Sequence, residues 1–100
     1  MEVKFKYTLS EMSAIRELFE RTVCNDDSKE PEDRLLVAVL INVYKRIVKN
    51  MLDVKDKYTL KYKPEEAIAF VLYFKDVAAL GIYENRLINM TIEQTDRKLL

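Results

Sequence analysis

The sequence predicts an α+β fold that is predominantly α-helical, with four helices and a two-stranded β-ribbon in the order βααβαα. Two segments, VKFKYTL at residues 3–9 and KYTLKYK at 57–63, alternate apolar and polar residues. Each is followed by two stretches whose apolar residues recur at helical spacing. The 100 residues include 49% hydrophobic residues, one glycine and two prolines, which is typical of a helix-rich single domain over 1–100.

The two alternating segments are predicted to be strands that pair with each other, because an isolated strand is not stable in water. The first places Val3, Phe5 and Tyr7 on one side and Lys4 and Lys6 on the other. The second repeats this arrangement, with apolar residues toward the helices and polar residues outward: Tyr58, Leu60 and Tyr62 against Lys57, Thr59, Lys61 and Lys63.

The first helix is predicted over residues 8–23. Thr8 and Glu11 have the spacing of a capping box, in which each side chain accepts a hydrogen bond from the backbone N–H of the other residue. The segment 24–30 is rich in acidic and turn-forming residues and is expected to be a loop. The apolar residues of this helix recur every three or four positions and define one buried stripe: Met12, Ile15, Leu18, Phe19 and Val23.

The second and third helices are both predicted to begin at a proline followed by two acidic residues. Pro31 opens the second helix, which runs to about Leu52, and Pro64 opens the third. The stretches LLVAVLI (35–41) and AIAFVLYF (67–74) are apolar around most of the helix. For the second helix this pattern predicts burial on every side at 35–41.

The end of the chain is predicted to be a fourth helix over residues 82–100. Gly81, the only glycine, is expected to end the third helix in a left-handed conformation. The last turns are polar and are expected to fray. The residues expected to face inward are Tyr83, Leu87, Ile88 and Met90.

A short repeat raises the question of an internal duplication. The tetrapeptide KYTL occurs at Lys6–Leu9 and at Lys57–Leu60, but aligning these copies puts the following helices out of register. A shift of 55 residues instead aligns 6–19 with 61–74 and matches five of fourteen positions. This alignment suggests a pseudo-repeat with halves 1–54 and 55–100, although the starts of helices also converge on such patterns for physical reasons. Two copies are too few for a solenoid.

Charge and cysteine content narrow the expected compartment and partners. Basic and acidic residues balance at 17 each, so no net field attracts the chain to nucleic acid or to an anionic membrane. Cys24 is the only cysteine, which excludes an internal disulfide and fits a reducing cytoplasm. Residues 1–9 lack the apolar core of a signal peptide, and the run 35–41 is far shorter than the roughly 20 residues that span a bilayer. A cytoplasmic protein without a membrane segment is expected.

The residue types that most enzymes and metal sites need are scarce. The chain has no histidine, one cysteine and one glycine, which excludes zinc clusters, glycine-rich phosphate loops and Ser–His–Asp triads. The acidic segment 25–33 lacks the glycine of a calcium-binding loop. Glu65 and Glu66 are adjacent and therefore diverge on a helix, and a helix C-terminus raises the pKa of a thiol such as Cys24. We expect no enzyme, no cofactor and no metal site.

Three functions remain, and the favoured one is a non-catalytic protein-interaction protein. Two helices that are apolar nearly all round carry more apolar surface than a core of this size encloses easily. Surplus apolar surface favours self-association, most simply as a homodimer. Such a protein would act as an adaptor, a regulator or an assembly factor.

The second function is nucleic-acid binding through a basic surface. If the strands pair, their lysines share an outward face, although lysines on edge strands also prevent aggregation and a solvated sheet face needs polar residues in any case. The candidate residues lie on both strands, on the second helix and ahead of the third: Lys4, Lys6, Lys45, Arg46, Lys49, Lys57, Lys61 and Lys63.

The third function is binding of a small ligand or a peptide in an aromatic groove. The same aromatic residues would otherwise form the core between the sheet and the helices. They are Phe5, Tyr7, Tyr58, Tyr62, Phe70, Tyr73, Phe74 and Tyr83.

Overall fold

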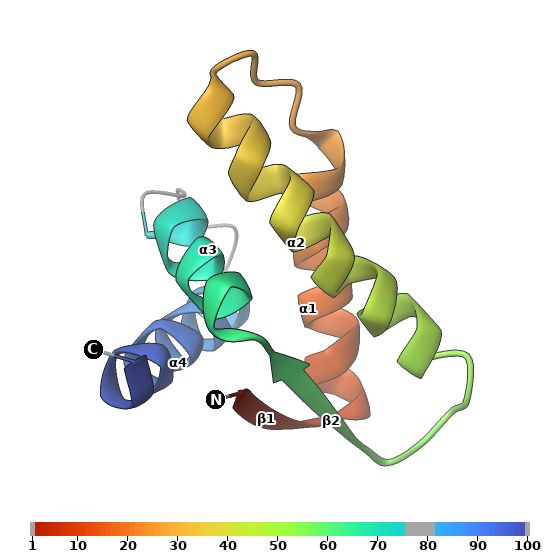
Figure 1. Cartoon of the computed structure of the whole chain (residues 1–100). Helices are drawn as coiled ribbons and strands as arrows, with labels where there is room; N and C mark the ends of the chain where they lie inside the picture. Colours follow the sequence, from red (N-terminus) through yellow and green to blue (C-terminus); the bar gives the residue numbers. More distant parts are fainter. Residues whose placement is uncertain (1, 76–81, 100) are drawn as a thin grey trace.

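The computed structural model describes residues 2–75 and 82–99, with side chains at 2–75 and 86–97 (Figure 1). The predicted α+β class and the order βααβαα are confirmed. The conformation expected at Gly81 and the side chain of Tyr83 lie outside the described residues. In chain order the elements are β1 (Val3–Thr8), α1 (Leu9–Arg21), the short 3-10 helix η1 (Val23–Asn25), α2 (Pro31–Asn50), β2 (Lys57–Tyr62), α3 (Pro64–Phe74) and α4 (Ile82–Leu99).

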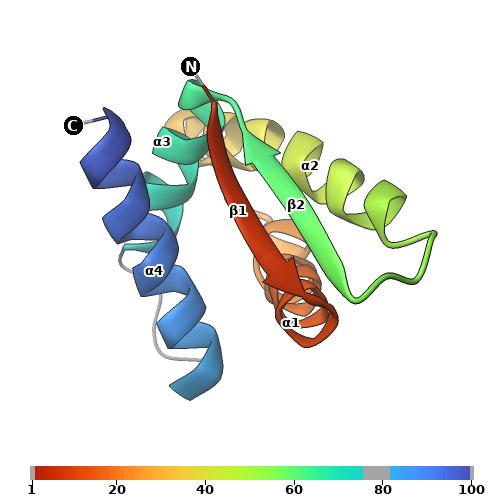
Figure 2. The ribbon, with the colours of Figure 1, turned by 90° about the horizontal axis from the view of Figure 1, so that it is seen from below.

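The strands β1 and β2 pair as predicted, in an antiparallel ribbon with a register from Val3↔Tyr62 to Thr8↔Lys57. This register keeps the alternation of the two strands in phase, so all inward side chains are buried and all outward ones are exposed. Figure 2 shows the ribbon in front of α1, with α2 and α4 beside its two edges. One face of the ribbon therefore packs on the helices and the other meets solvent.

Both edges of the ribbon are bonded to a helix side chain. On the β1 edge, Gln94 of α4 donates from Nε2 to the carbonyl of Lys4 at 3.1 Å. On the β2 edge, Arg46 of α2 donates from Nη2 to the carbonyl of Lys61 at 3.2 Å. Free backbone groups on a strand edge invite pairing with another chain. These two bonds, with the helices that make them, protect the ribbon from such pairing.

The helix starts follow the capping signals in the sequence. Glu11 Oε1 accepts from the Thr8 N–H at 2.8 Å, and Thr8 Oγ1 accepts from the Glu11 N–H at 3.2 Å, which confirms the capping box. At the start of α3, Glu66 Oε1 accepts from the Lys63 N–H at 2.8 Å. Thr8 and Glu11 correspond to Lys63 and Glu66 under the shift of 55 residues, so the two strand–helix joints share a contact. An ancient duplication stays a hypothesis.

The core lies between the ribbon and the helices, and a series of aromatic rings connects its parts. The ring centroids are 5.3 Å apart for Phe5 and Tyr62, 5.9 Å for Tyr62 and Phe70, and 4.4 Å for Phe70 and Phe74. Phe19 of α1 contacts Phe74 at 5.8 Å. Such pairs add about 0.5–1.5 kcal/mol each beyond the burial of their area. The rings therefore tie β1, β2, α1 and α3 into one core, to which the predicted α1 stripe also belongs.

Burial of α2 on every side at residues 35–41 is wrong. Leu40 is buried, but Leu35 is largely exposed. On one flank of α2 the Tyr44 hydroxyl donates to Glu20 of α1 at 2.7 Å, and on the other flank Arg46 reaches Glu66 of α3. Because α2 packs between these two helices, its remaining side faces solvent even where it is apolar.

The inward face of α4 is also rotated from the predicted one. Leu87 and Ile88 are buried as expected, but Met90 is exposed. Thr91 lies in the core instead, where its hydroxyl donates to the carbonyl of Leu87 at 2.9 Å. A threonine that bonds back to its own helix can occupy an inward position because its polar group is satisfied locally. In the part of the chain that the structure describes, no helix has the length and hydropathy to cross a membrane.

Candidate functional site

The outward side of the ribbon is a cluster of exposed lysines, which we call the lysine ribbon face. In the strand register Lys4 lies directly opposite Lys61, so two positively charged residues form a cross-strand pair. Among the described residues the ion pairs are Arg16–Glu20, Arg21–Glu17 and Arg46–Glu66, and none of them includes a lysine. The face consists of Lys4, Lys6, Lys57, Lys61 and Lys63.

The other three basic residues of the predicted patch are not on this face. Lys45 and Lys49 are exposed on the outer side of α2. Arg46 is bonded internally, because its Nη2 lies 2.5 Å from Glu66 Oε1 and also donates to the Lys61 carbonyl. The structure therefore brings five of the eight residues together and uses Arg46 to join α2, β2 and α3.

The predicted aromatic set is part of the core. Six of its members are at most 4% exposed and pack as described above, so they do not line an open groove. Tyr73 is half-buried, and the side chain of Tyr83 lies outside the described residues. The six buried members are Phe5, Tyr7, Tyr58, Tyr62, Phe70 and Phe74.

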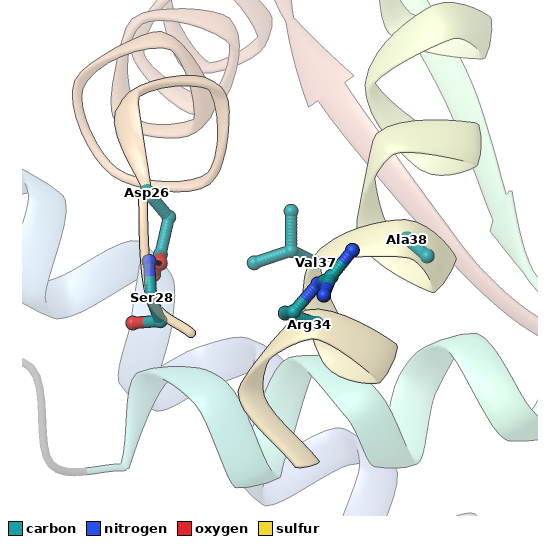
Figure 3. Close-up of a pocket in the computed structure, with 5 residues that line it drawn as sticks. All are labelled: Asp26, Ser28, Arg34, Val37 and Ala38. Carbon is teal, nitrogen blue, oxygen red and sulfur yellow. Dashed lines mark hydrogen bonds between the residues drawn. The ribbon is translucent and has the colours of Figure 1, made fainter. Parts of the chain in front are cut away.

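A pocket of about 220 Å³ opens between the acidic loop and the start of α2 (Figure 3). Asp26 accepts from the Tyr73 hydroxyl at 2.6 Å and from the Ser28 N–H at 2.8 Å, and these bonds lower the pKa of Asp26. Burial and the same carboxylate raise the pKa of Tyr73. This link between the loop and α3 joins residues 47 positions apart, and the sequence carries no signal for it. The pocket lining is Asp26, Ser28, Arg34, Val37 and Ala38.

Neither the thiol nor the acidic residues form a reactive centre in the described part of the chain. Partial desolvation and, to a lesser extent, the nearby Glu20 carboxylate raise the pKa of the exposed Cys24 thiol, which disfavours the nucleophilic thiolate. Among the described residues there is no group of three or more Cys, Asp or Glu side chains that could hold a metal ion.

Buried hydroxyls form a polar group between the ribbon and α4: those of Tyr7, Tyr62, Thr91 and Thr95. Desolvation is the main cause that raises the pKa of Tyr7 to about 12 and the pKa of Tyr62 well above its ordinary value, so both phenols are neutral at physiological pH. The Tyr7 hydroxyl lies near those of Thr91 and Tyr62. In the described residues, however, the hydroxyls of Tyr7, Tyr62 and Thr95 have no hydrogen bond of good geometry.

Exposed apolar side chains gather on α2 and α3, and we call this surface the apolar helix face. Leu35 of α2 is 66% exposed, and Ile68 and Leu72 of α3 are 43% and 47% exposed. The two helices pack against each other, and Figure 1 shows them side by side. Three large apolar side chains on neighbouring helices are therefore exposed to solvent.

The exposed stripe of α3 has an ordered pattern of charge. Glu65, Ile68, Leu72 and Lys75 are all exposed and follow each other at spacings of three, four and three residues. Residues at this spacing lie in one row along a helix. The row thus begins with a negative charge, passes through two apolar side chains and ends with a positive charge.

The geometry assigns two surfaces, one basic and one apolar, and no catalytic constellation within the described residues. Comparisons of the chain with models of protein families, with curated proteins and with solved structures found no match.

Proposed function

We propose that this protein is a non-catalytic protein-interaction protein that forms a homodimer through the apolar helix face. The observation that carries the proposal is the exposure of Leu35, Ile68 and Leu72 on two adjacent helices. Fully burying such a side chain contributes about 1.5–3 kcal/mol, so covering these half-exposed ones contributes about 1 kcal/mol each. A two-fold dimer buries six of them, and the total, on the order of 6 kcal/mol, corresponds to a dissociation constant of roughly tens of micromolar.

The charge pattern of α3 favours a second copy as the occupant of this face. In a two-fold interface the same surface meets itself, so its charges must be complementary when the order is reversed. With a two-fold axis between Ile68 and Leu72, α3 lies antiparallel to its copy. Glu65 then approaches the partner's Lys75, and Ile68 approaches the partner's Leu72. Along the row of α3 side chains, opposite charges therefore meet at both ends of the contact and apolar side chains meet in the middle.

We assign the dimer to the cytoplasm, where it acts as an adaptor, a regulator or an assembly factor. The support for this compartment is the single cysteine, Cys24, whose exposed thiol has no disulfide partner in the chain. The proposal of a non-catalytic role rests on the composition, which lacks histidine, and on the raised pKa values of Tyr7, Tyr62 and Cys24, which make these groups harder to deprotonate than usual.

Light scattering coupled to size exclusion tests the proposal directly. At roughly several hundred micromolar, well above that dissociation constant, we expect a mass close to twice the chain mass of 11.8 kDa. Leu72→Glu places a charge in the apolar contact and should return the mass to that of the monomer. Met90→Glu is the matched control, because Met90 of α4 is 46% exposed and lies on another helix. A monomeric wild type, or a Leu72→Glu variant that remains dimeric, would contradict the proposal.

A further inference from the structure

We propose that the lysine ribbon face binds the phosphate backbone of double-stranded nucleic acid without sequence preference. This inference goes beyond the proposed dimer and rests on other residues. The ribbon face and the apolar helix face lie on different elements, except that β2 leads directly into α3.

Protection of strand edges does not account for these lysines. Lysines on edge strands usually keep one sheet from pairing with another. Here Gln94 bonds to the carbonyl of Lys4 and Arg46 bonds to the carbonyl of Lys61, so helices α4 and α2 already block the two edges. The lysine side chains also point away from the edges, out of the solvated face.

The arrangement of the lysines is unfavourable for the isolated protein. Like charges directly opposite each other on a sheet are destabilising, and Lys4 faces Lys61 in this way. Thr8 and Thr59, or any other polar residue, would satisfy an outward strand position without this repulsion. The concentration of positive charge therefore needs a reason outside the fold, and an anionic ligand provides one.

The acidic loop before α2 is too far away to neutralise the ribbon, and among the described residues only Glu2, Glu11 and Asp56 lie beside its ends. In Figure 1 the loop that precedes α2 is at the top of the molecule and the ribbon is at the bottom. From Pro31 to Arg46, which contacts β2, α2 extends about 22 Å. At physiological ionic strength charges are screened over about 8 Å. A ligand at the ribbon thus meets an excess of positive charge, five lysines against three nearby carboxylates, despite the net charge of zero.

The chemistry of the face selects phosphates of a duplex among polyanions. Outward side chains on one strand are about 6.8 Å apart and opposite ones about 5 Å apart, which gives two parallel rows of cations. Stacking on single-stranded bases needs exposed aromatic rings, but Phe5, Tyr7, Tyr58 and Tyr62 all point inward. Arginine, asparagine and glutamine, which read base edges, do not occur on β1 or β2.

An anionic membrane is a less suitable ligand for this face. Peripheral membrane binding combines lysines with apolar side chains that enter the lipid. The outward positions of β1 and β2 hold only lysine and threonine. The face therefore offers no apolar side chain that could enter the lipid.

Fluorescence anisotropy with a labelled mixed-sequence DNA duplex of about two helical turns tests the inference, with the salt concentration varied. For up to five phosphate contacts the slope of log K against log salt should reach about −4.5. Lys4→Gln with Lys61→Gln should weaken binding at least tenfold and reduce the magnitude of the slope by about 2. The control, Lys29→Gln with Arg34→Gln, removes the same charge at the far end of α2 and should leave the affinity and the slope unchanged.

Several outcomes would overturn the inference. These are no binding of the duplex at low salt, equal losses of affinity in the ribbon and control variants, tighter binding to single strands than to the duplex, or binding to phosphatidylserine vesicles in place of the duplex. Light scattering on the same variants keeps this test separate from the dimer. An unchanged mass with lost DNA binding supports the ribbon site, whereas a fall in mass would show that the ribbon contacts a second copy instead. The thermal midpoint of the Lys4→Gln, Lys61→Gln variant should not fall, because the substitutions relieve repulsion.

Discussion

Replacing Glu66 by alanine should be among the most destabilising single substitutions of a charged residue in this protein. Glu66 is only 4% exposed although it is charged. Its Oε1 accepts from Arg46 Nη2 and from the Lys63 N–H, and Arg46 in turn donates to the Lys61 carbonyl. One carboxylate therefore connects α2, the end of β2 and the first turn of α3.

The magnitude follows from the bonds that are lost. A hydrogen bond to a charged group contributes about 1.5–3 kcal/mol. The Arg46 side chain is 36% exposed and can regain water after the substitution, so its bond counts at the low end of this range. With the N–H bond of Lys63, Glu66→Ala should cost about 3 kcal/mol, a large part of the roughly 5–15 kcal/mol that stabilises a domain. The thermal midpoint should fall by about 12–24 °C.

Thermal and urea unfolding followed by circular dichroism measures this change, and Glu65→Ala is the matched control. Glu65 is the neighbouring residue in the same helical turn, but it is exposed. Within one chain its loss removes a favourable interaction with the helix dipole, worth about 0.5 kcal/mol. If Glu66→Ala lowers stability no more than Glu65→Ala does, the carboxylate does not connect these elements and the reasoning fails.

Three further substitutions test other contacts by unfolding measurements. Thr8→Ala removes the capping box of α1 and should cost about 1 kcal/mol, whereas Ser10→Ala, on an exposed residue of the same turn, should cost much less. Tyr58→Phe should cost about 1–2 kcal/mol because the Tyr58 hydroxyl accepts from the Lys55 N–H and donates to the Asp53 carbonyl, but Tyr62→Phe should be neutral or stabilising because its buried hydroxyl lacks a well-formed bond. Tyr73→Phe should cost about 1 kcal/mol at pH 5–8. Because the pKa of Asp26 is lowered in the folded state, this contribution is present above the ordinary carboxyl pKa of about 3.9 and is lost as the pH falls from there through the lowered pKa. Equal costs for Tyr58→Phe and Tyr62→Phe, a larger cost for Ser10→Ala than for Thr8→Ala, or a pH-independent cost of Tyr73→Phe would contradict these assignments.

The elements and the ribbon were predictable because local chemistry determines them. Period-two alternation predicts both strands, and the pairing of Tyr7 with Tyr58 keeps their buried faces together. The Thr8 and Glu11 spacing predicts the start of α1, and proline predicts the starts of α2 and α3. These signals lie within a few residues of the features they determine, so a single sequence contains them.

The burial of apolar residues was predictable only where a helix has a single apolar stripe. Around Leu35 the sequence is apolar on all sides, and hydrophobicity alone cannot tell which side meets α1 or α3. Met90 and Thr91 are adjacent on α4, and a threonine in the core is not expected from hydrophobic patterning. Both errors concern the rotation of a helix against its neighbours, which depends on the packing of distant segments.

The candidate surfaces, too, were predictable only where the signal is local in the sequence. The outward lysines followed from the strand pattern once pairing was assumed. The structural role of Arg46 could not be predicted, because its partner Glu66 is 20 residues away in the sequence. A basic residue close to lysines in the sequence looks like a further member of the patch. The bond between Asp26 and Tyr73 likewise joins distant segments and turns part of an acidic loop into a structural contact.

Charge reversal on α3 tests the central claim, which is antiparallel self-association through the apolar helix face. In the proposed dimer Glu65 lies near the partner's Lys75 at both ends of the contact. Light scattering at a series of concentrations should therefore show weaker association for Glu65→Lys and for Lys75→Glu, and restored association when the two substitutions are combined. Equal dimerisation of all four proteins, or a double variant weaker than either single one, would contradict the account.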